Sequence, residues 1–295
     1  MTPEVMGERL PASYGGPCDA TVTTFEQVSR TRAPASGRES QVGKLLRTWR
    51  ERRRLTQLDL ALAADVSTRH ISYVETGRSK PTSQMILHLS DQLEIPLRER
   101  NVLLLAGGYA PAYPEHELNS PPMSVVNDAI NSVLEGHEPY PAIVVDRHWE
   151  LVAGNAAIAV LTEGAATHLL EPPVNVLRLS LHPEGMAPRI ANLGQWREHI
   201  LYRLAHQAQA TGDAALRELH DELAGYPGAS PHAQAGAAPA IVVPLRYRTL
   251  HGELSFFSTT TVFGTPMDVT VAELAIEAFY PADAPTAEIL KRLAG

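Results

Sequence analysis

The segment Leu55–Pro81, LTQLDLALAADVSTRHISYVETGRSKP, constrains the fold more than any other part of the chain. Its apolar residues repeat at helical spacing in two short runs. Thr56 with Asp59 three residues later is typical of a capping box that opens a helix, and Ser67 or Thr68 is suited to cap a second one. The pattern predicts two short helices joined by a tight turn. The second helix has a polar stripe that could enter a DNA groove.

The residues around this segment complete a helical domain. Before it, four apolar positions share one face of an expected helix: Val42, Leu45, Leu46 and Trp49. After it, Gly77 is expected to end the second helix of the pair. A fourth helix is expected to open at Thr82 or Ser83 and close before Pro96, and a fifth to span Leu97–Ala106. We therefore predict five short helices at residues 39–110.

Charge is distributed unevenly along the chain, whose net charge is −8. Residues 41–110 carry 11 Lys and Arg against 7 Asp and Glu, a net of +4, whereas residues 111–295 carry 10 against 21, a net of −11. Basic charge is thus concentrated around the two-helix pattern, as contacts with DNA phosphates require. The acidic remainder is not expected to bind nucleic acid.

A helix in the major groove reads bases only through its solvent-facing side chains. The bidentate guanidinium of Arg69 can recognise guanine and is the leading specificity residue. Gln57 is expected to hold a phosphate and support the second helix of the pair, while Arg78 and Lys80 should contact the DNA backbone. The full set of predicted DNA-binding residues is Gln57, Ser67, Thr68, Arg69, Ser72, Tyr73, Arg78 and Lys80.

This pattern resembles the helix-turn-helix domain of the phage-repressor/XRE family. The matching residues are Thr56, Gln57, Leu60, Ala61, Ile71, Ser72, Val74, Glu75, Gly77, Arg78 and Pro81. The resemblance implies an ion pair between the first helix of the domain and the end of the recognition helix, at Arg50 and Glu75. The alternative is a plain helical hairpin in a core or an interaction bundle, but the register and the local basic charge favour DNA binding.

The rest of the chain divides by composition. Residues 1–38 are rich in Thr, Ser, Pro and Gly and are expected to form a disordered arm, and residues 111–123 a proline-rich linker. The single cysteine, Cys18, allows no internal disulfide. There is neither a secretory signal nor an apolar run of the roughly 20 residues that cross a bilayer. We expect a cytoplasmic protein without a membrane segment.

Residues 124–295 have the pattern of an α+β domain, a small antiparallel sheet with helices. A helix opens the domain, a hairpin follows it, and Asn155 is expected to cap the next helix. Two long helices and a low-complexity loop, Gly225–Pro239, then precede the closing strands. The expected segments are helices Val125–Glu135, Asn155–Leu161, Leu193–Ala210 and Ala214–Leu223, strands Pro141–Asp146, Trp149–Ala153, Ala240–Arg248, Gly252–Val262 and Glu273–Phe279, and a proline-containing tail.

No catalytic residues are predicted in this half. It lacks a G-x-S-x-G motif, a glycine-rich phosphate loop and a Cys/His pattern at metal-binding spacing. Its histidines are scattered, so most are expected to be ordinary surface or core residues, and neither a metal site nor a tightly bound cofactor is expected.

Three blocks in this half resemble the ligand-binding domain of MmyB/MltR-like transcription regulators: PAIVVDRHWELVAGNAAIAVL, HPEGMAPRIANL and GELSFFSTTTVFGTPMDVTVAELAIEAFYPAD. The resemblance implies a PAS-like domain whose cavity takes a small apolar or amphipathic molecule, such as a non-covalently bound fatty acid. The expected walls are apolar, and the expected polar ends are His182 and Arg189. The walls are Trp149, Leu177, Leu179, Ile190, Trp196, Phe256 and Phe257; each also fits ordinary core packing, and Arg189 equally fits a structural ion pair.

The sequence thus predicts a homodimeric transcription regulator, not an enzyme, that binds double-stranded DNA at a palindromic operator and is controlled by a small ligand. Three alternatives for the C-terminal half stay open: a module that only dimerises or binds a protein partner, a catalytic domain, or a domain that holds haem or flavin. A cavity or co-purified lipid, a cluster of titratable residues, or a coloured protein would distinguish them.

Overall fold

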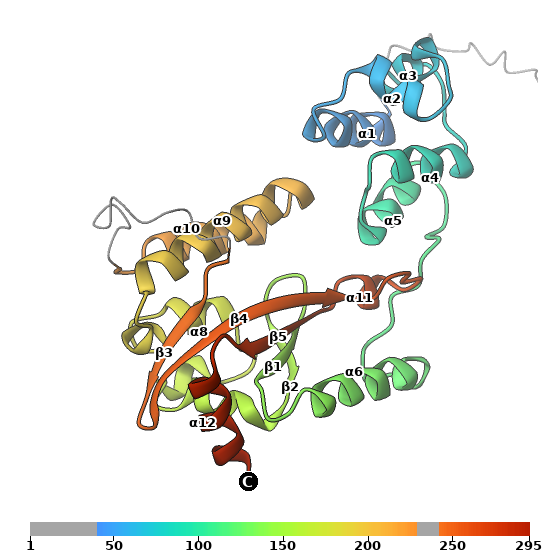
Figure 1. Ribbon diagram of the computed structural model, residues 1–295. Helices are drawn as coiled ribbons and strands as arrows, with labels where there is room; N and C mark the ends of the chain where they lie inside the picture. The colour runs from blue at the N-terminus through green and yellow to red at the C-terminus, as the bar shows by residue number, and fades with distance from the viewer. Residues whose placement is uncertain (1–39, 229–241) are drawn as a thin grey trace, which may run out of the picture. The chain divides into compact units, whose positions relative to one another are not determined.

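The computed structural model describes residues 40–228 and 242–295. The expected arm at residues 1–38 and most of the expected loop Gly225–Pro239 lie outside the described residues. Figure 1 labels the elements along the chain. In the part of the chain that is described, no helix has the length and apolar character needed to span a membrane.

The N-terminal domain consists of short helices, and all but the last of them are opened by a local side-chain cap. Side-chain oxygens of Ser40, Thr56, Ser67 and Thr82 each accept a backbone N–H of the first turn that follows. At Thr56 the reciprocal bond from Asp59 completes the predicted capping box. The helices are α1 (Gln41–Arg52), α2 (Gln57–Ala63), α3 (Thr68–Glu75), α4 (Ser83–Gln92) and α5 (Leu97–Ala106), as the sequence predicted.

One apolar cluster holds these helices together. Leu46 from α1, Leu60 from α2 and Ile71 from α3 are almost fully buried in it. The closest approach of two helices is at Gly43, where a β-carbon would overlap the carbonyl oxygen of Val74 and lie 2.8 Å from that of Glu75. Glycine at this position therefore lets α1 cross directly over the end of α3.

The C-terminal domain is built on a five-stranded antiparallel sheet in the order β2-β1-β5-β4-β3. The last strand of the chain is therefore the central one, and it pairs with both β1 and β4. The long, Thr- and Phe-rich β4 has the β-branched and aromatic composition that favours strands. The strands are β1 (Ala142–Val145), β2 (Leu151–Gly154), β3 (Leu245–Thr249), β4 (Gly252–Val262) and β5 (Ala275–Pro281).

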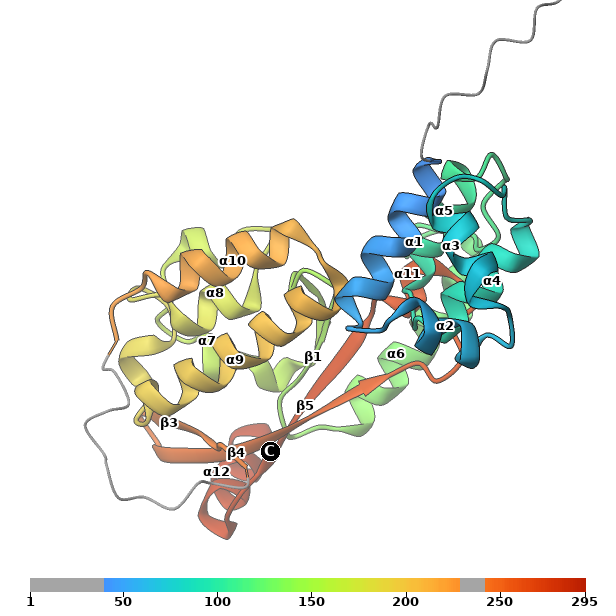
Figure 2. The same cartoon turned by 90° about the horizontal axis from the view of Figure 1, so that it is seen from above.

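Helices pack around this sheet. The longest, α9, and its successor α10 lie side by side, as both views show (Figures 1 and 2). The α-helices are α6 (Ser124–Gly136), α7 (Ala159–Thr162), α8 (Val176–Leu181), α9 (Leu193–Thr211), α10 (Ala214–Ala224), α11 (Val269–Ala272) and α12 (Ala284–Ala294). The described residues also form short 3₁₀ turns: η1 (Pro121–Met123), η2 (Ala156–Ile158), η3 (Thr167–Leu169) and η4 (Ala187–Arg189).

The structure departs from the predicted elements at several places. Strand β3 begins at Leu245, later than the expected Ala240, and helices α8, α11 and α12 were not predicted. The predicted cap at Asn155 is wrong, because its side chain makes no capping bond to the following turn. Instead it accepts the N–H of Ala142 at 3.0 Å and donates to the carbonyls of Leu134 and Tyr140, so it links α6 to the first hairpin.

The expected linker at residues 111–123 makes hydrogen bonds at several positions. The Asn101 side chain in α5 accepts the N–H groups of Ala112 and Tyr113. Further on, the His116 ring contacts the Asp268 carboxylate at 2.7 Å. The segment is thus bonded at residues 112–116 and already helical from residue 121.

Candidate nucleic-acid interface and ligand domain

Helix α3 is positioned by the turn that precedes it. Asp65 takes a left-handed backbone conformation with φ of 51°, which reverses the chain after α2. The N–H of Val66 bonds the carbonyl of Ala61 at 2.9 Å, and the buried, small Ala61 lets α2 and α3 pack closely. The two helices therefore form the tight pair that the sequence predicted.

A buried ion pair fixes the far end of α3. The Arg50 guanidinium donates to both carboxylate oxygens of Glu75, at 2.7 and 3.0 Å, and also to the Leu55 carbonyl. The hydrogen bond with Glu75 raises the pKa of Arg50 above its ordinary value. The Gln57 amide donates to the same carboxylate at 2.8 Å, so Gln57 supports α3 as expected. The implied pair is thus present, and it joins α1, α2 and α3.

The outward face of α3 carries the predicted base-reading residues. Ser67, Thr68 and Arg69 are exposed, whereas Ser72 and Tyr73 are half-buried. The Arg69 Nε donates to the Tyr73 hydroxyl at 2.8 Å, and its guanidinium lies 5.1 Å from the centre of the Tyr73 ring. The structure therefore brings these side chains together on one polar, solvent-facing surface.

The two predicted phosphate-binding residues lie immediately after α3. Arg78 and Lys80 are exposed, and they follow Gly77, whose φ of 74° ends the helix. The Arg78 guanidinium lies 5.8 Å from the Tyr73 ring, so two cations flank one aromatic side chain. This surface offers bidentate donors, hydroxyl groups and positive charge, which together suit a DNA groove.

Tyr109, which is not among the predicted DNA-binding residues, contacts the segment that follows α3. Its hydroxyl donates to the Pro81 carbonyl at 3.0 Å, and its ring lies 5.3 Å from the Lys80 ammonium. It therefore holds the segment that carries the predicted phosphate contacts. The signal was an aromatic residue directly after Gly107 and Gly108, which end α5.

In the C-terminal domain, most of the expected ligand-binding walls lie in a single apolar core. Trp149 and Trp196 belong to it, and each indole N–H is bonded, to Gln207 and to Ser180 respectively. Its members among the expected walls are Trp149, Leu177, Leu179, Ile190, Trp196 and Phe256.

Phe257 does not join this core. Successive side chains of a strand point to opposite faces, so the neighbour of the fully buried Phe256 faces the other way. Phe257 is 38% exposed and stacks on Tyr280, with ring centres 5.3 Å apart. Phe256 and Phe257 therefore do not share one wall, and the ligand-binding role of Phe257 stays a prediction.

The two expected polar ends have different partners. His182 is half-buried, and its ring packs edge-on against Tyr226 and His168. Arg189 lies 3.7 Å from the Glu163 carboxylate, which fits the alternative of a structural ion pair. Neither contact tests whether these residues bind a ligand, so both assignments stay predictions.

Both halves of the chain match known families. Residues 46–100 match the helix-turn-helix family, and residues 126–293 match the family described as the MmyB-like transcription regulator ligand binding domain. The second match covers more than half of the chain. The chain belongs to the MmyB-like transcription regulators. It therefore joins a helix-turn-helix domain to a ligand-binding domain, as the sequence predicted.

Other comparisons add little to this assignment. No curated protein matches the chain. A solved structure titled "Structure of an RNA-binding Light-Oxygen-Voltage Receptor" is 14% identical, with 86% of this chain and 64% of that one covered, at a TM-score of 0.27. The chain spans less than two thirds of that protein. At so low a TM-score, the match indicates neither the fold nor the function of this regulator.

The MmyB-like ligand domain also contains a polar cluster that the sequence analysis missed. Glu277 in β5 is 5% exposed, bonds the Thr260 hydroxyl at 2.7 Å and pairs with Arg203 of α9. The Arg203 guanidinium also lies 4.5 Å from the Trp149 ring. Burial and the nearby Arg203 lower the pKa of His199, one turn earlier on α9. These residues lie far apart in sequence, so no local pattern indicated the cluster.

Proposed function

We propose that the chain is a transcription regulator that reads operator DNA through the exposed face of α3 and responds to a small apolar or amphipathic molecule bound in its C-terminal domain. The observation that carries the first part is the arrangement of Arg69, Tyr73 and Arg78. Two guanidinium groups flank one aromatic ring on an exposed helix end. This arrangement supplies both a base-reading donor pair and phosphate contacts.

Replacing Arg69 tests the base-reading role. Arg69→Lys keeps the positive charge but loses the planar donor pair, so binding to random DNA should persist while discrimination falls by about 1–3 kcal/mol, roughly 5- to 150-fold. Fluorescence anisotropy would measure both affinities, with an operator selected from a random duplex pool. Equal losses on the operator and on random DNA would reject a base contact by Arg69.

Arg78→Ala provides the contrasting result. A lost phosphate contact should weaken binding to all duplexes alike and lower the salt slope of binding by about 1. Arg217→Ala is the matched control, because it removes an exposed positive charge on α10, in the ligand domain. An unchanged slope for Arg78→Ala, or the same change for Arg217→Ala, would contradict the assignment.

The proposed regulator is a homodimer. Two α3 helices read successive half-sites of a palindrome when they lie about one DNA turn apart, roughly 34 Å. A ligand changes DNA binding only when it binds one arrangement of the two heads more tightly than the other. Because its partner is DNA, we place the regulator in the cytoplasm, and we propose no catalytic role.

For the ligand we propose a fatty acid or a similar amphiphile. The supporting observation is that six expected wall residues share one large apolar core in a family of ligand-binding domains. Such a core suits an acyl chain, which needs few polar anchors. The proposed PAS-like character of the domain agrees with a ligand held between helices and sheet.

Native mass spectrometry of the full chain tests the ligand and the oligomer together. We expect a dimer that retains an acyl ligand, and fatty acids added to delipidated protein should restore the liganded mass and change operator affinity. A dimer with no bound acyl ligand, and with no response to a series of fatty acids, would favour the alternative that the domain only dimerises or binds a protein partner.

A further inference from the structure

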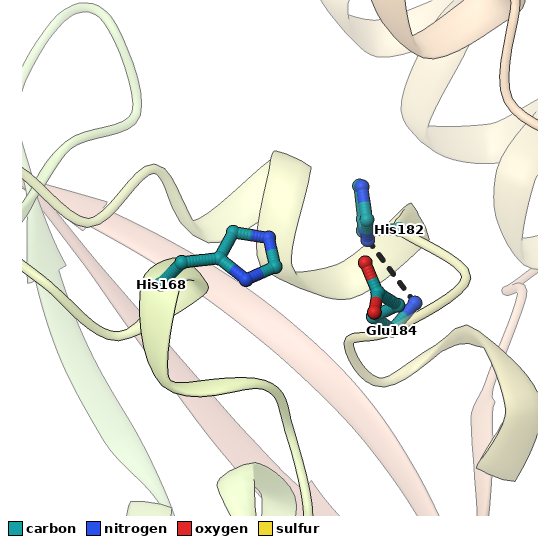
Figure 3. A group of neighbouring side chains, drawn as sticks. All are labelled: His168, His182 and Glu184. Atoms are coloured by element: carbon teal, nitrogen blue, oxygen red, sulfur yellow. Dashed lines mark hydrogen bonds between the residues drawn. The ribbon is translucent and has the colours of Figure 1, made fainter.

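A cluster of two imidazoles and one carboxylate lies on the ligand domain. His168 comes from η3, whereas His182 and Glu184 come from the turn after α8. One potential ligand atom from each residue lies within 4.8 Å of the others, and Figure 3 shows the side chains converging from the two segments. Within residues 40–228 and 242–295, no other three His, Cys or acidic side chains bring their ligand atoms so close together.

We propose that His168, His182 and Glu184 bind a divalent transition-metal ion, with Zn²⁺ as the preferred ion. The two imidazole nitrogens favour Zn²⁺ over Ca²⁺ and Mg²⁺, which take oxygen ligands, and Zn²⁺ also accepts a carboxylate oxygen. Three protein ligands leave one tetrahedral position for water or another donor.

The backbone of the site is rigidly placed. The N–H of Ala166 bonds the Glu184 carbonyl at 2.8 Å, which joins the segment before η3 to the turn that carries the other two ligands. Leu169 and Met186 anchor the two segments in the apolar core. A β-carbon at Gly185 would overlap the Leu179 carbonyl oxygen, so the turn is tightly packed against α8.

The side chains must move closer together to complete the site. Two ligand atoms at about 2.1 Å from a tetrahedral Zn²⁺ lie about 3.4 Å apart, so atoms that are separated by up to 4.8 Å must approach by up to about 1.4 Å. His168 and Glu184 are exposed, whereas His182 is half-buried and packs edge-on against Tyr226 and His168. We therefore expect closure by rotation of the two exposed side chains.

Neighbouring groups leave the ligands available. Among the described residues, no hydrogen bond or ion pair engages the Glu184 carboxylate, and the nearby Arg178 pairs with Glu222 instead. The Tyr226 hydroxyl also donates to Glu222. The His182 Nδ1 accepts the Glu184 N–H at 3.1 Å, and a metal ion at this nitrogen must displace that bond. We therefore expect weaker binding than at a closed structural zinc site.

This cluster could hardly be predicted from the sequence. His182 and Glu184 form the start of the HPEG block, but His168 lies 14 positions earlier and the pattern matches no metal-binding spacing. The fold brings them together through the bond between Ala166 and Glu184. An ion here would cross-link these two segments. Leu169 in one segment and Leu179 beside the other pack in the core that we propose as the ligand site.

The test is a Zn²⁺ titration of the untagged full chain after EDTA treatment, against a chromophoric zinc chelator. Wild type should bind one Zn²⁺ per chain, and Glu184→Gln and His168→Ala should each weaken this binding at least about tenfold. His220→Ala is the control, because His220 also lies beside an acidic residue, Asp221, but without a third ligand. It should bind Zn²⁺ like wild type.

Hydrogen exchange gives a second readout that does not depend on stoichiometry. Zn²⁺ should slow amide exchange in peptides covering residues 166–186 of wild type, but not of Glu184→Gln, whose exposed side chain can be replaced without unfolding the domain. Absence of Zn²⁺ binding to wild type overturns the proposal. So does equal binding by wild type, Glu184→Gln and His168→Ala, which would show adventitious binding elsewhere.

Discussion

Glu75→Ala should destabilise the helix-turn-helix domain by about 3–5 kcal/mol, because it leaves the Arg50 guanidinium buried without its partner. Arg50 is 8% and Glu75 5% exposed, so water cannot replace the lost carboxylate. The variant also removes the acceptor of the Gln57 amide, which links α2 to the end of α3. We therefore expect operator binding to fall as well, although Glu75 does not face DNA.

Amide hydrogen exchange of the full chain can measure this effect in one domain at a time. Peptides from residues 41–109 should exchange faster in Glu75→Ala, while peptides from residues 126–293 serve as an internal reference. Glu51→Ala is the matched control, because Glu51 is an exposed acid whose pair with Arg47, and whose longer contact with Arg50 at 3.8 Å, should contribute little to stability. A loss below about 1 kcal/mol for Glu75→Ala would contradict the buried-pair argument.

A double replacement distinguishes the cost of one unpaired buried charge from the cost of losing the shape of the two side chains. Arg50→Met with Glu75→Leu removes both charges and keeps apolar volume, so it should be far less destabilising than Glu75→Ala alone. If the double variant is as unstable as Glu75→Ala, side-chain packing rather than the unpaired charge determines the loss of stability.

The helix-turn-helix domain could be predicted almost completely because its signals are local. Helices α1 to α4 are each opened by a capping residue within one turn, and the end of α3 is set by Gly77 with its positive φ. The exposed face of α3 follows from the same periodicity. Tyr109 was missed because its role depends on Lys80 and Pro81, almost 30 positions away.

The ligand domain was less predictable because its elements are short and its contacts are long-range. Helix α8 has six residues, too few to show a helical period. Helix α12 was not predicted because Pro285 suggested an irregular tail. Proline nevertheless fits the first turn of a helix, where the N–H that it lacks would have no partner within the helix. The role of Asn155 could not be inferred, since its partners lie on α6 and β1.

Strand geometry determines which of the neighbours Phe256 and Phe257 is buried and contributes more to stability. Phe256 is fully buried and packs edge-on against Phe279 in the main core, with ring centres 6.2 Å apart. Phe256→Ala should cost about 3–5 kcal/mol through lost burial and the cavity left behind. Phe257→Ala removes a half-exposed ring stacked on Tyr280, worth about 0.5–1.5 kcal/mol as an aromatic pair.

Urea unfolding followed by hydrogen exchange in residues 126–293 would compare the two variants, with wild type as the reference. If the core is also the ligand site, Phe256→Ala should lose acyl-ligand binding, whereas Phe257→Ala should bind normally. Equal destabilisation by the two variants would contradict the assigned register of β4, in which Phe257 pairs with Tyr280. Loss of ligand binding in Phe257→Ala alone would instead place the ligand on the opposite face of the sheet.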